Sequence, residues 1–209
     1  MRLIKYTHAC VRIEDGDRVL VIDPGNYSEP DAIDGADDIL VTHEHADHID
    51  VENIKKARES NPRLTVYTHE ALASQLTDLG DGVRTVAAGE DFTVAGFAVR
   101  AVGGEHAEIY DGLPGCPNIG FIVDGNVYHP GDSFFVPAES VETLLVPASA
   151  PWMKLAEALD FTRAIKPTRA FPIHDAMLSE IGLGNFSRWM EMKGETDYKR
   201  LNPRDEVSL

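Results

Sequence analysis

Cysteine and basic residues are both scarce in this 209-residue chain. It has two cysteines, Cys10 and Cys116, and 19 Lys and Arg residues against 35 Asp and Glu residues. Two cysteines do not make the disulfide framework of a small secreted protein, so we expect free thiols in a reducing compartment. The formal net charge of −16 repels phosphate backbones at long range, which disfavours nucleic acid as a partner. A small anionic substrate remains open, because bound metal ions can dominate the local field.

Long apolar segments are missing as well. No run of residues approaches the ~20 that a membrane span needs, and the first six residues are too short and polar for a secretory signal. No repeat of short period and no low-complexity linker divides the chain. We therefore expect a cytoplasmic protein whose residues 1–209 form a single domain, with a polar tail at about 195–209 that can fray.

Short apolar stretches, separated by glycine and proline, predict an α/β protein. Strands are expected at 2–7, 10–14, 18–22, 39–42, 64–68, 83–87, 91–95, 97–102, 119–123, 126–129, 143–146 and 169–173. Helices are expected at about 50–59, 69–79, 154–165 and 178–192, the first with Asp50 as its N-cap. This order of elements predicts two sheets stacked face to face with helices outside. The order is strands, two β-α units, more strands and two further β-α units.

The most informative segment lies between the strand at 39–42 and the helix that follows. It holds His43, His45, Asp47 and His48, four side chains that can bind a metal ion. Residues two apart in extended backbone point to the same side, so His43 and His45 can bind one ion together. Where the chain turns toward the helix, Asp47 and His48 diverge and can serve a second ion. This density of ligands indicates a catalytic metal site with positions left for water.

The segment resembles the His-x-His-x-Asp-His signature of the metallo-β-lactamase superfamily. Later features resemble its further motifs in the expected order: His106 in a loop after a strand, Asp132 after Gly131, and His174 at a strand end. Asp23 resembles the first aspartate motif, and we expect it to orient the ligand loop by hydrogen bonds. The resemblance covers about residues 1–185 and looks closest to compact members that include L-ascorbate-6-phosphate lactonase. It implies a four-layer αββα sandwich.

The resemblance also implies a function. A hydroxide that bridges two metals would cleave a small ester, lactone or phosphoester. Metal ions lower the pKa of bound water, so this hydroxide is available at neutral pH. Two divalent ions per chain are expected, zinc by default with manganese or iron as alternatives. Catalytic roles would fall to Asp132, Asp47 and His174. By the resemblance, one metal is held by His43, His45 and His106. The other is held by Asp47, His48 and His174, and Asp132 bridges the two.

Several other residues have open roles. His8, at the end of the first strand, is either a group behind the ligands or a substrate contact. We expect His129 and His69 to be structural. Trp152 either lines the pocket or anchors the following helix in the core, and the second interpretation is favoured. Ser133 lacks the sequence context of a nucleophilic serine.

Two alternative functions remain. A nuclease or phosphodiesterase of the same superfamily is disfavoured by the acidic charge and by the lack of room for an added domain. A non-hydrolytic di-iron redox protein or metal sensor is disfavoured because relatives with di-iron centres carry glutamate where His45 stands. The expected partner is a small molecule, without nucleic acid or membrane, and a homo-oligomer is possible.

Overall fold

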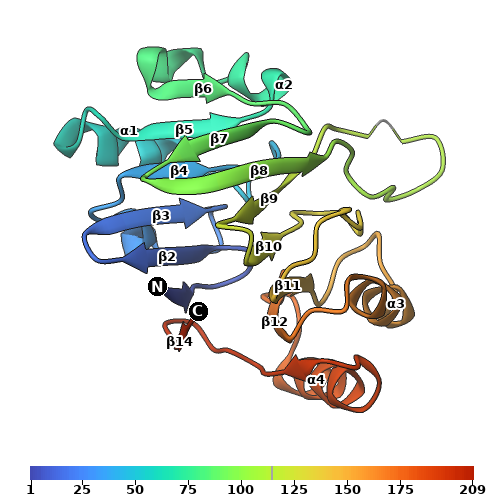
Figure 1. Cartoon of the computed structure of the whole chain (residues 1–209). Helices are drawn as coiled ribbons and strands as arrows, with labels where there is room; N and C mark the ends of the chain where they lie inside the picture. The colour runs from blue at the N-terminus through green and yellow to red at the C-terminus, as the bar shows by residue number, and fades with distance from the viewer. Residues whose placement is uncertain (114) are drawn as a thin grey trace.

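The computed structural model, which describes residues 1–113 and 115–209, contains two seven-stranded sheets that pack face to face (Figure 1). The first sheet has the order β14 (Glu206–Ser208), β1 (Arg2–Lys5), β2 (Val11–Asp15), β3 (Arg18–Ile22), β4 (Asp38–Leu40), β5 (Thr65–Thr68) and β6 (Val83–Thr85). The second has the order β13 (Asp197–Tyr198), β12 (Arg169–Ile173), β11 (Thr143–Pro147), β10 (Val127–His129), β9 (Ile119–Val123), β8 (Phe97–Gly103) and β7 (Asp91–Val94).

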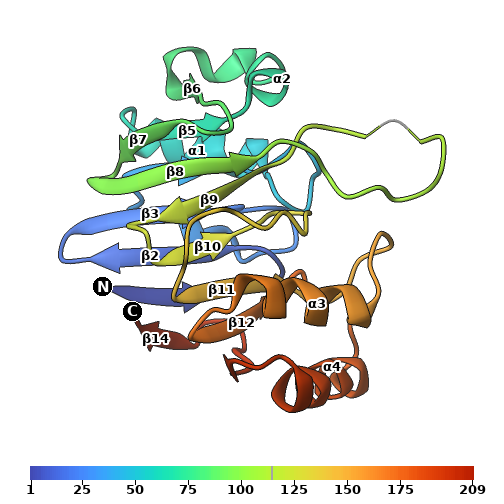
Figure 2. The same cartoon turned by 45° about the vertical axis from the view of Figure 1, so that its right-hand side comes forward.

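Helices cover the outer face of each sheet. Next to the first sheet lie α1 (Val51–Ser60) and α2 (Glu70–Ala73), with 3-10 helices at Pro30–Ile33 and Thr77–Gly82. Next to the second lie α3 (Leu155–Ile165) and α4 (Glu180–Lys193). Figure 2 shows α3 and α4 outside the sheet that contains β11 and β12. This is the αββα sandwich that the sequence predicts.

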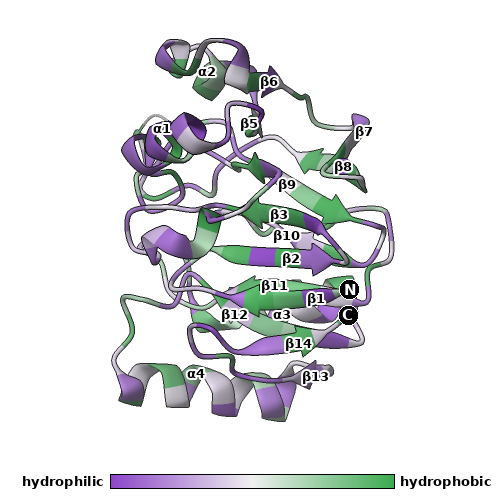
Figure 3. Ribbon diagram, turned by 90° about the vertical axis from the view of Figure 1, so that its left-hand side faces the viewer, coloured by the Kyte–Doolittle hydropathy of each residue, from purple (hydrophilic) through white to green (hydrophobic). Residues whose placement is uncertain are grey.

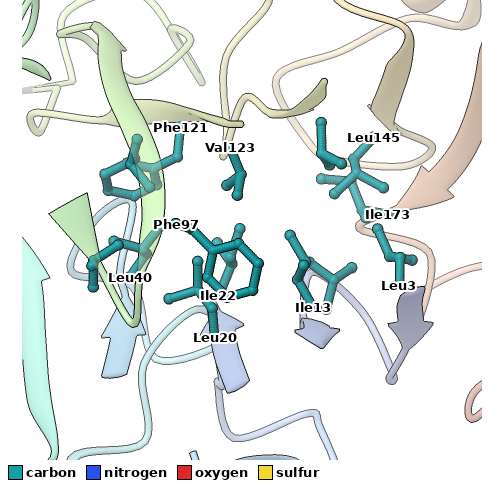
Figure 4. Close-up of a cluster of buried hydrophobic side chains, with 14 of the residues drawn as sticks. Leu3, Ile13, Leu20, Ile22, Leu40, Phe97, Phe121, Val123, Leu145 and Ile173 are labelled. Carbon is teal, nitrogen blue, oxygen red and sulfur yellow. The ribbon is translucent and has the colours of Figure 1, made fainter. Parts of the chain in front are cut away.

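Alternation along each strand divides the apolar side chains between the layers. In β3, Leu20 and Ile22 enter the core between the sheets, whereas Val21 faces the first helical layer. In β11, Leu145 enters the same core and Leu144 faces α3 and α4. Figure 4 shows this core, and Figure 3 shows hydrophobic colouring concentrated on the strands. Burial on both faces explains why these strands read as continuous apolar runs.

Parallel pairing brings several strand ends to one edge of the sandwich. Strands β3 to β6 run parallel, joined through the helical segments outside, and β10 to β13 also run parallel. The carboxyl ends of parallel strands meet at the same edge, and the loops after β1, β3, β4, β8, β10, β11 and β12 carry the side chains described below. Figure 1 shows the long loop after β8 projecting from this edge.

Two expectations are corrected by the structure. The helix expected at 69–79 is split, because α2 ends at Ala73 and a 3-10 helix follows; Leu72, Leu76 and Leu79 nevertheless keep their buried face. The tail does not fray: β13 and β14 extend both sheets, and Leu201 is 1% exposed in the central core. The few apolar side chains of this segment pack against the central core. Among the described residues, no helix combines the length and apolar character that crossing a bilayer requires.

Candidate metal centre

Two groups of potential metal ligands face each other at the edge where the strands end. Within each group the ligand atoms lie within 4.8 Å of one another. The first group consists of His43, His45, His106 and Asp132, and the second of His8, Asp47, His48 and His174. All seven predicted ligands are therefore brought together, and His8 joins them. The groups combine residues from loops that follow β1, β4, β8, β10 and β12, which are far apart in the sequence.

The imidazole nitrogens in the first group converge on a carboxylate. Nε2 of His43 lies 3.0 Å from Nδ1 of His45. Nε2 of His106 lies 3.3 Å from Oδ2 of Asp132, and Nε2 of His43 lies 3.9 Å from the same oxygen. The second group converges on Asp47, whose Oδ2 lies 3.5 Å from Nε2 of His174.

Asp132 occupies the space between the two groups. Its Oδ1 lies 3.0 Å from Nε2 of His48, and its Oδ2 lies 3.2 Å from Nε2 of His174. Together with the contact to His106, these distances show that Asp132 lies close to residues of both groups. The turn before Asp132 depends on Gly131, whose φ of +62° and whose close approach to Asn118 and Thr42 leave no room for a Cβ. This position suits the bridging role that the resemblance implies.

Hydrogen bonds fix three of the histidine rings so that Nε2 faces the centre. Nδ1–H of His48 donates to Oδ2 of Asp23 (2.7 Å), and that of His106 donates to the carbonyl of Ala107 (2.6 Å). Nδ1–H of His174 donates to the carbonyl of Ser149. Each partner can only accept, so the proton must sit on Nδ1, and the lone pair on Nε2 is free.

His43 is fixed in the same way through a relay. The hydroxyl of Thr42 donates to Oδ2 of Asp23 (2.7 Å), so its oxygen is left to accept from Nδ1–H of His43 (3.0 Å). The backbone N–H of Thr42 also donates to Oδ1 of Asp23 (2.8 Å). The fully buried Asp23 thus orients two ligand histidines by hydrogen bonds, which is the role expected for it.

Four of the inward-facing atoms are buried and make no well-directed hydrogen bond among the described residues, although each nitrogen lies 3.0–3.3 Å from a carboxylate oxygen of Asp132: Nε2 of His48, His106 and His174, and Oδ1 of Asp132. Such orphaned groups cost free energy in a folded protein unless a water or an ion satisfies them. Unprotonated imidazole nitrogens with carboxylate oxygens are the ligand set of zinc, manganese and iron. The residues therefore fit a metal centre.

The electrostatics of the centre also suit cations. Burial lowers the pKa of His174, but the nearby carboxylates of Asp132 and Asp47 outweigh it and raise the pKa to about 9. Burial raises the pKa of Asp132, but the neighbouring histidines, His48 foremost, hold it well below its ordinary value. The carboxylates thus attract positive charge into the centre.

Three further histidines, His8, His69 and His129, have the opposite arrangement. Nδ1 accepts from a backbone N–H in each: from Ala176 for His8 (3.4 Å), from Gly131 for His129 (3.1 Å) and from Leu72 for His69 (3.2 Å). The proton therefore lies on Nε2, where it blocks the lone pair. In His129 it donates to the carbonyl of Ala9 (2.8 Å) and in His8 to Oδ2 of Asp47 (3.0 Å). His8 accordingly supports Asp47, and His129 and His69 are structural.

Two residues near the centre, Lys5 and Asn118, were not assigned from the sequence, and a third, Trp152, was favoured as a core anchor. Lys5 is fully buried, and its Nζ donates to the carbonyl of His8 (2.8 Å) and to Oδ1 of Asp175 (3.2 Å). Asn118 accepts from the backbone N–H of Asp132 (3.0 Å). Trp152 is 9% exposed and donates from Nε1 to Oδ2 of Asp132 (3.0 Å), so it is more than a core anchor. Of the two unassigned residues, Lys5 had a sequence signal: a lysine on the inward face of an alternating strand.

A cavity of about 880 Å³ opens beside the first ligand group. His45 and His106 form its inner wall, and the loop between β8 and β9 supplies most of the rest, including Glu105, Glu108 and Leu113. Cys116 also lines it, with Sγ 3.9 Å from Nε2 of His45. Burial raises the pKa of this thiol to about 11. A substrate in the cavity would meet the ligand group directly.

Comparisons with known proteins agree with this geometry. The family model for the β-lactamase superfamily domain matches residues 2–174. Protein Rv0786c of Mycobacterium tuberculosis is 38% identical over the full length of both chains. A UPF0173 protein of Pyrococcus furiosus is 30% identical over 92% of each chain, and a UPF0173 metal-dependent hydrolase of Thermoplasma volcanium is 29% identical over 83% of each.

Solved structures share the fold. The metallo hydrolase Igni18 of Ignicoccus hospitalis superposes with a TM-score of 0.76 at 19% identity, over 99% of this chain and 97% of that one. The di-iron β-hydroxylase CmlA of Streptomyces venezuelae superposes with a TM-score of 0.78 at 17% identity, over 100% of this chain and 54% of that one. One fold thus accommodates different metal chemistries, and the site must decide the reaction.

Proposed function

Because this chain belongs to the metallo-β-lactamase superfamily and to its UPF0173 family of metal-dependent hydrolases, we propose that it hydrolyses a small ester, lactone or phosphoester at two bound divalent metal ions. Zinc is the metal we propose first, since imidazole nitrogens outnumber carboxylates among the ligands. With two free cysteines, the protein suits a reducing compartment, and we propose the cytoplasm.

One observation carries the proposal. The buried orphaned nitrogens of His48, His106 and His174 and the orphaned Oδ1 of Asp132 face one another, and acceptors behind each ring keep the protons on Nδ1. A purely structural cluster would satisfy these atoms internally. A rigid set of lone pairs beside an open cavity is what a catalytic metal site requires.

When bound, divalent cations at the two groups supply Lewis acidity and lower the pKa of a coordinated water. The chain's own residues supply the positioning. Asp132, held by Asn118 on its backbone and by Trp152 on its carboxylate, can orient the proton of an attacking water. Asp47, whose side chain is 24% exposed, lies 3.5 Å from His174, and we propose that the Asp47 carboxylate accepts or returns a proton as the leaving group departs, while His174 would hold the metal beside it.

Metal analysis and two ligand variants test the proposal. The purified protein should hold close to two transition-metal ions per chain. His45→Ala and Asp132→Ala should abolish turnover of lactones, thioesters and phosphodiesters, because each removes a ligand from the centre. The matched control is His69→Asn, which replaces another buried histidine with a good helix N-cap outside the centre and should leave turnover within about twofold.

Three results would contradict the proposal. Full turnover in both ligand variants would exclude a role for the centre. Tight RNA binding at low salt would favour the nuclease. Bound iron that is redox-active, without hydrolysis of any substrate in the panel, would favour the di-iron or sensor alternative.

A further inference from the structure

The cavity beside the ligand group carries charge of one sign. Of the described residues that line it, Glu44, Glu105 and Glu108 are acidic and none is lysine or arginine. A phosphate-binding cavity would present Arg, Lys or backbone N–H groups to the substrate instead. The lining is therefore opposite to what an anionic substrate needs.

Bound cations do not reverse this sign. Two divalent ions bring four positive charges, and the carboxylates of Asp47 and Asp132 neutralise two of them. The three glutamates outnumber the two charges that remain, so the cavity stays negative with its centre filled. His45 and His106 line the same cavity, so a bound substrate would lie between these ligands and the glutamates.

The cavity also has an apolar part. Ile109 and Leu113 line it from the loop between β8 and β9, and both are exposed, at 42% and 57%. Figure 2 shows this loop extending away from the two sheets at the strand-end edge. Exposed apolar side chains beside carboxylates suit a molecule with both an apolar and a positive portion.

We propose that the cavity selects a substrate whose acyl part is apolar and positively charged, and disfavours anionic substrates such as phosphomonoesters. This rests on the proposed function for the hydrolytic step, and it narrows that function toward esters and lactones of amine-bearing acids.

Kinetics on a matched series test the substrate preference. The substrates are 4-nitrophenyl esters of one chain length whose acyl end is trimethylammonium, tert-butyl or carboxylate; the first two have the same shape. For the zinc-loaded protein, kcat/KM should fall in that order, by about tenfold between the extremes. In 1 M NaCl, where the Debye length is about 3 Å, the ratio should approach one. An order that is reversed or absent would overturn the proposal.

Cys116 provides a second measurement that does not need hydrolysis. It lines the cavity, whereas Cys10 is fully buried, so thiosulfonate reagents should label Cys116. The probes are the trimethylammonium-ethyl and the sulfonatoethyl methanethiosulfonates, each rate being divided by its rate with 2-mercaptoethanol. The same thiolate attacks both probes and displaces methanesulfinate, so its pKa cancels in the ratio. The cationic probe should be favoured by about tenfold, and Cys116→Ser should abolish labelling.

A double variant locates the charges responsible. Glu105→Gln with Glu108→Gln should lower the probe ratio and the ester ratio by about threefold or more. Glu59→Gln, which removes the same charge from the exposed end of α1, should leave both ratios unchanged. Equal probe rates in the native protein, or no labelling of Cys116, would overturn the charge assignment. If probe rates follow charge but no ester is hydrolysed, the proposed hydrolysis fails and the cavity assignment stands.

Discussion

Replacing Asp23 with asparagine should weaken metal binding, although Asp23 is not among the proposed ligands. Its Oδ1 accepts from the backbone of Thr42, and its Oδ2 accepts from both the Thr42 hydroxyl and Nδ1–H of His48. An amide has one oxygen and one NH2, so one of these positions must become a donor. If the oxygen stays with the Thr42 backbone, NH2 faces His48, whose proton must then move to Nε2 and block the metal.

The magnitude follows from those contacts. Loss of a partner behind a metal-bound histidine typically lowers affinity 10- to 100-fold, which is about 1.4–2.7 kcal/mol. The metal-free protein should also lose about 2 kcal/mol of its free energy of unfolding, because hydrogen bonds to a buried carboxylate are each worth about 1.5–3 kcal/mol. In the opposite orientation the amide would face the Thr42 N–H with its own donor, at a similar cost.

Three assays check this prediction: competition with a chelator for metal affinity, urea unfolding for stability, and imidazole ¹⁵N NMR for the His48 tautomer. The matched control is Asp124→Asn. Asp124 has the same left-handed backbone, with φ of 50° against 51° for Asp23, and also accepts from a backbone N–H, but lies in the β9–β10 hairpin at the far edge. Native metal affinity in the Asp23 variant, with the His48 proton on Nδ1, would refute the reasoning.

Three further substitutions have expected outcomes. His8→Phe removes the donor to Asp47 and should weaken one of the two metals about tenfold, measured as metal retained after dialysis against chelator; equal retention would contradict it. Trp152→Phe keeps an aromatic ring but removes the donor to Asp132, and kcat should fall about tenfold or more with both metals retained. Asp38→Asn should stabilise the protein at pH 7 but not at pH 3. Burial raises the pKa of Asp38 in the folded state, so the charged form destabilises the fold only above the unfolded pKa, and equal stabilisation at both pH values would exclude this cause.

The fold was predictable where alternation and caps are strong. The β2–β3 pair follows the strands expected at 10–14 and 18–22, and α1 begins after the expected Asp50 cap, whose side chain accepts from Asn53 N–H. The errors arose where tertiary packing overrides local pattern. The last residues are polar, yet pairing of β14 with β1 and burial of Leu201 order them. Local sequence patterns do not predict a strand whose pairing partner is about 200 residues away in the chain.

The candidate site divides in the same way. Four of the seven proposed ligands could be named from their short spacing after a strand, and the other three from the resemblance to the superfamily's later motifs. The contacts behind them could not be predicted, because Lys5, Asn118 and Trp152 act through hydrogen bonds that only the folded chain creates. His8 was left open for the same reason: its role depends on which ring nitrogen accepts from Ala176.

Backbone strain indicates that the centre is built before any metal arrives. His8, Asp23 and His174 all have left-handed backbones, with φ of 66°, 51° and 55°, at the ends of three strands. Such residues cost about 1–3 kcal/mol each and persist only where the surroundings over-determine them. Here the N–H of His174 donates to the carbonyl of His8 (3.1 Å), and Nζ of Lys5 donates to the same carbonyl. Because these bonds join protein groups alone, they hold the turns without an ion. We therefore expect the fold to position the ligands in advance, so that metal binding satisfies the orphaned atoms rather than organising the chain around them.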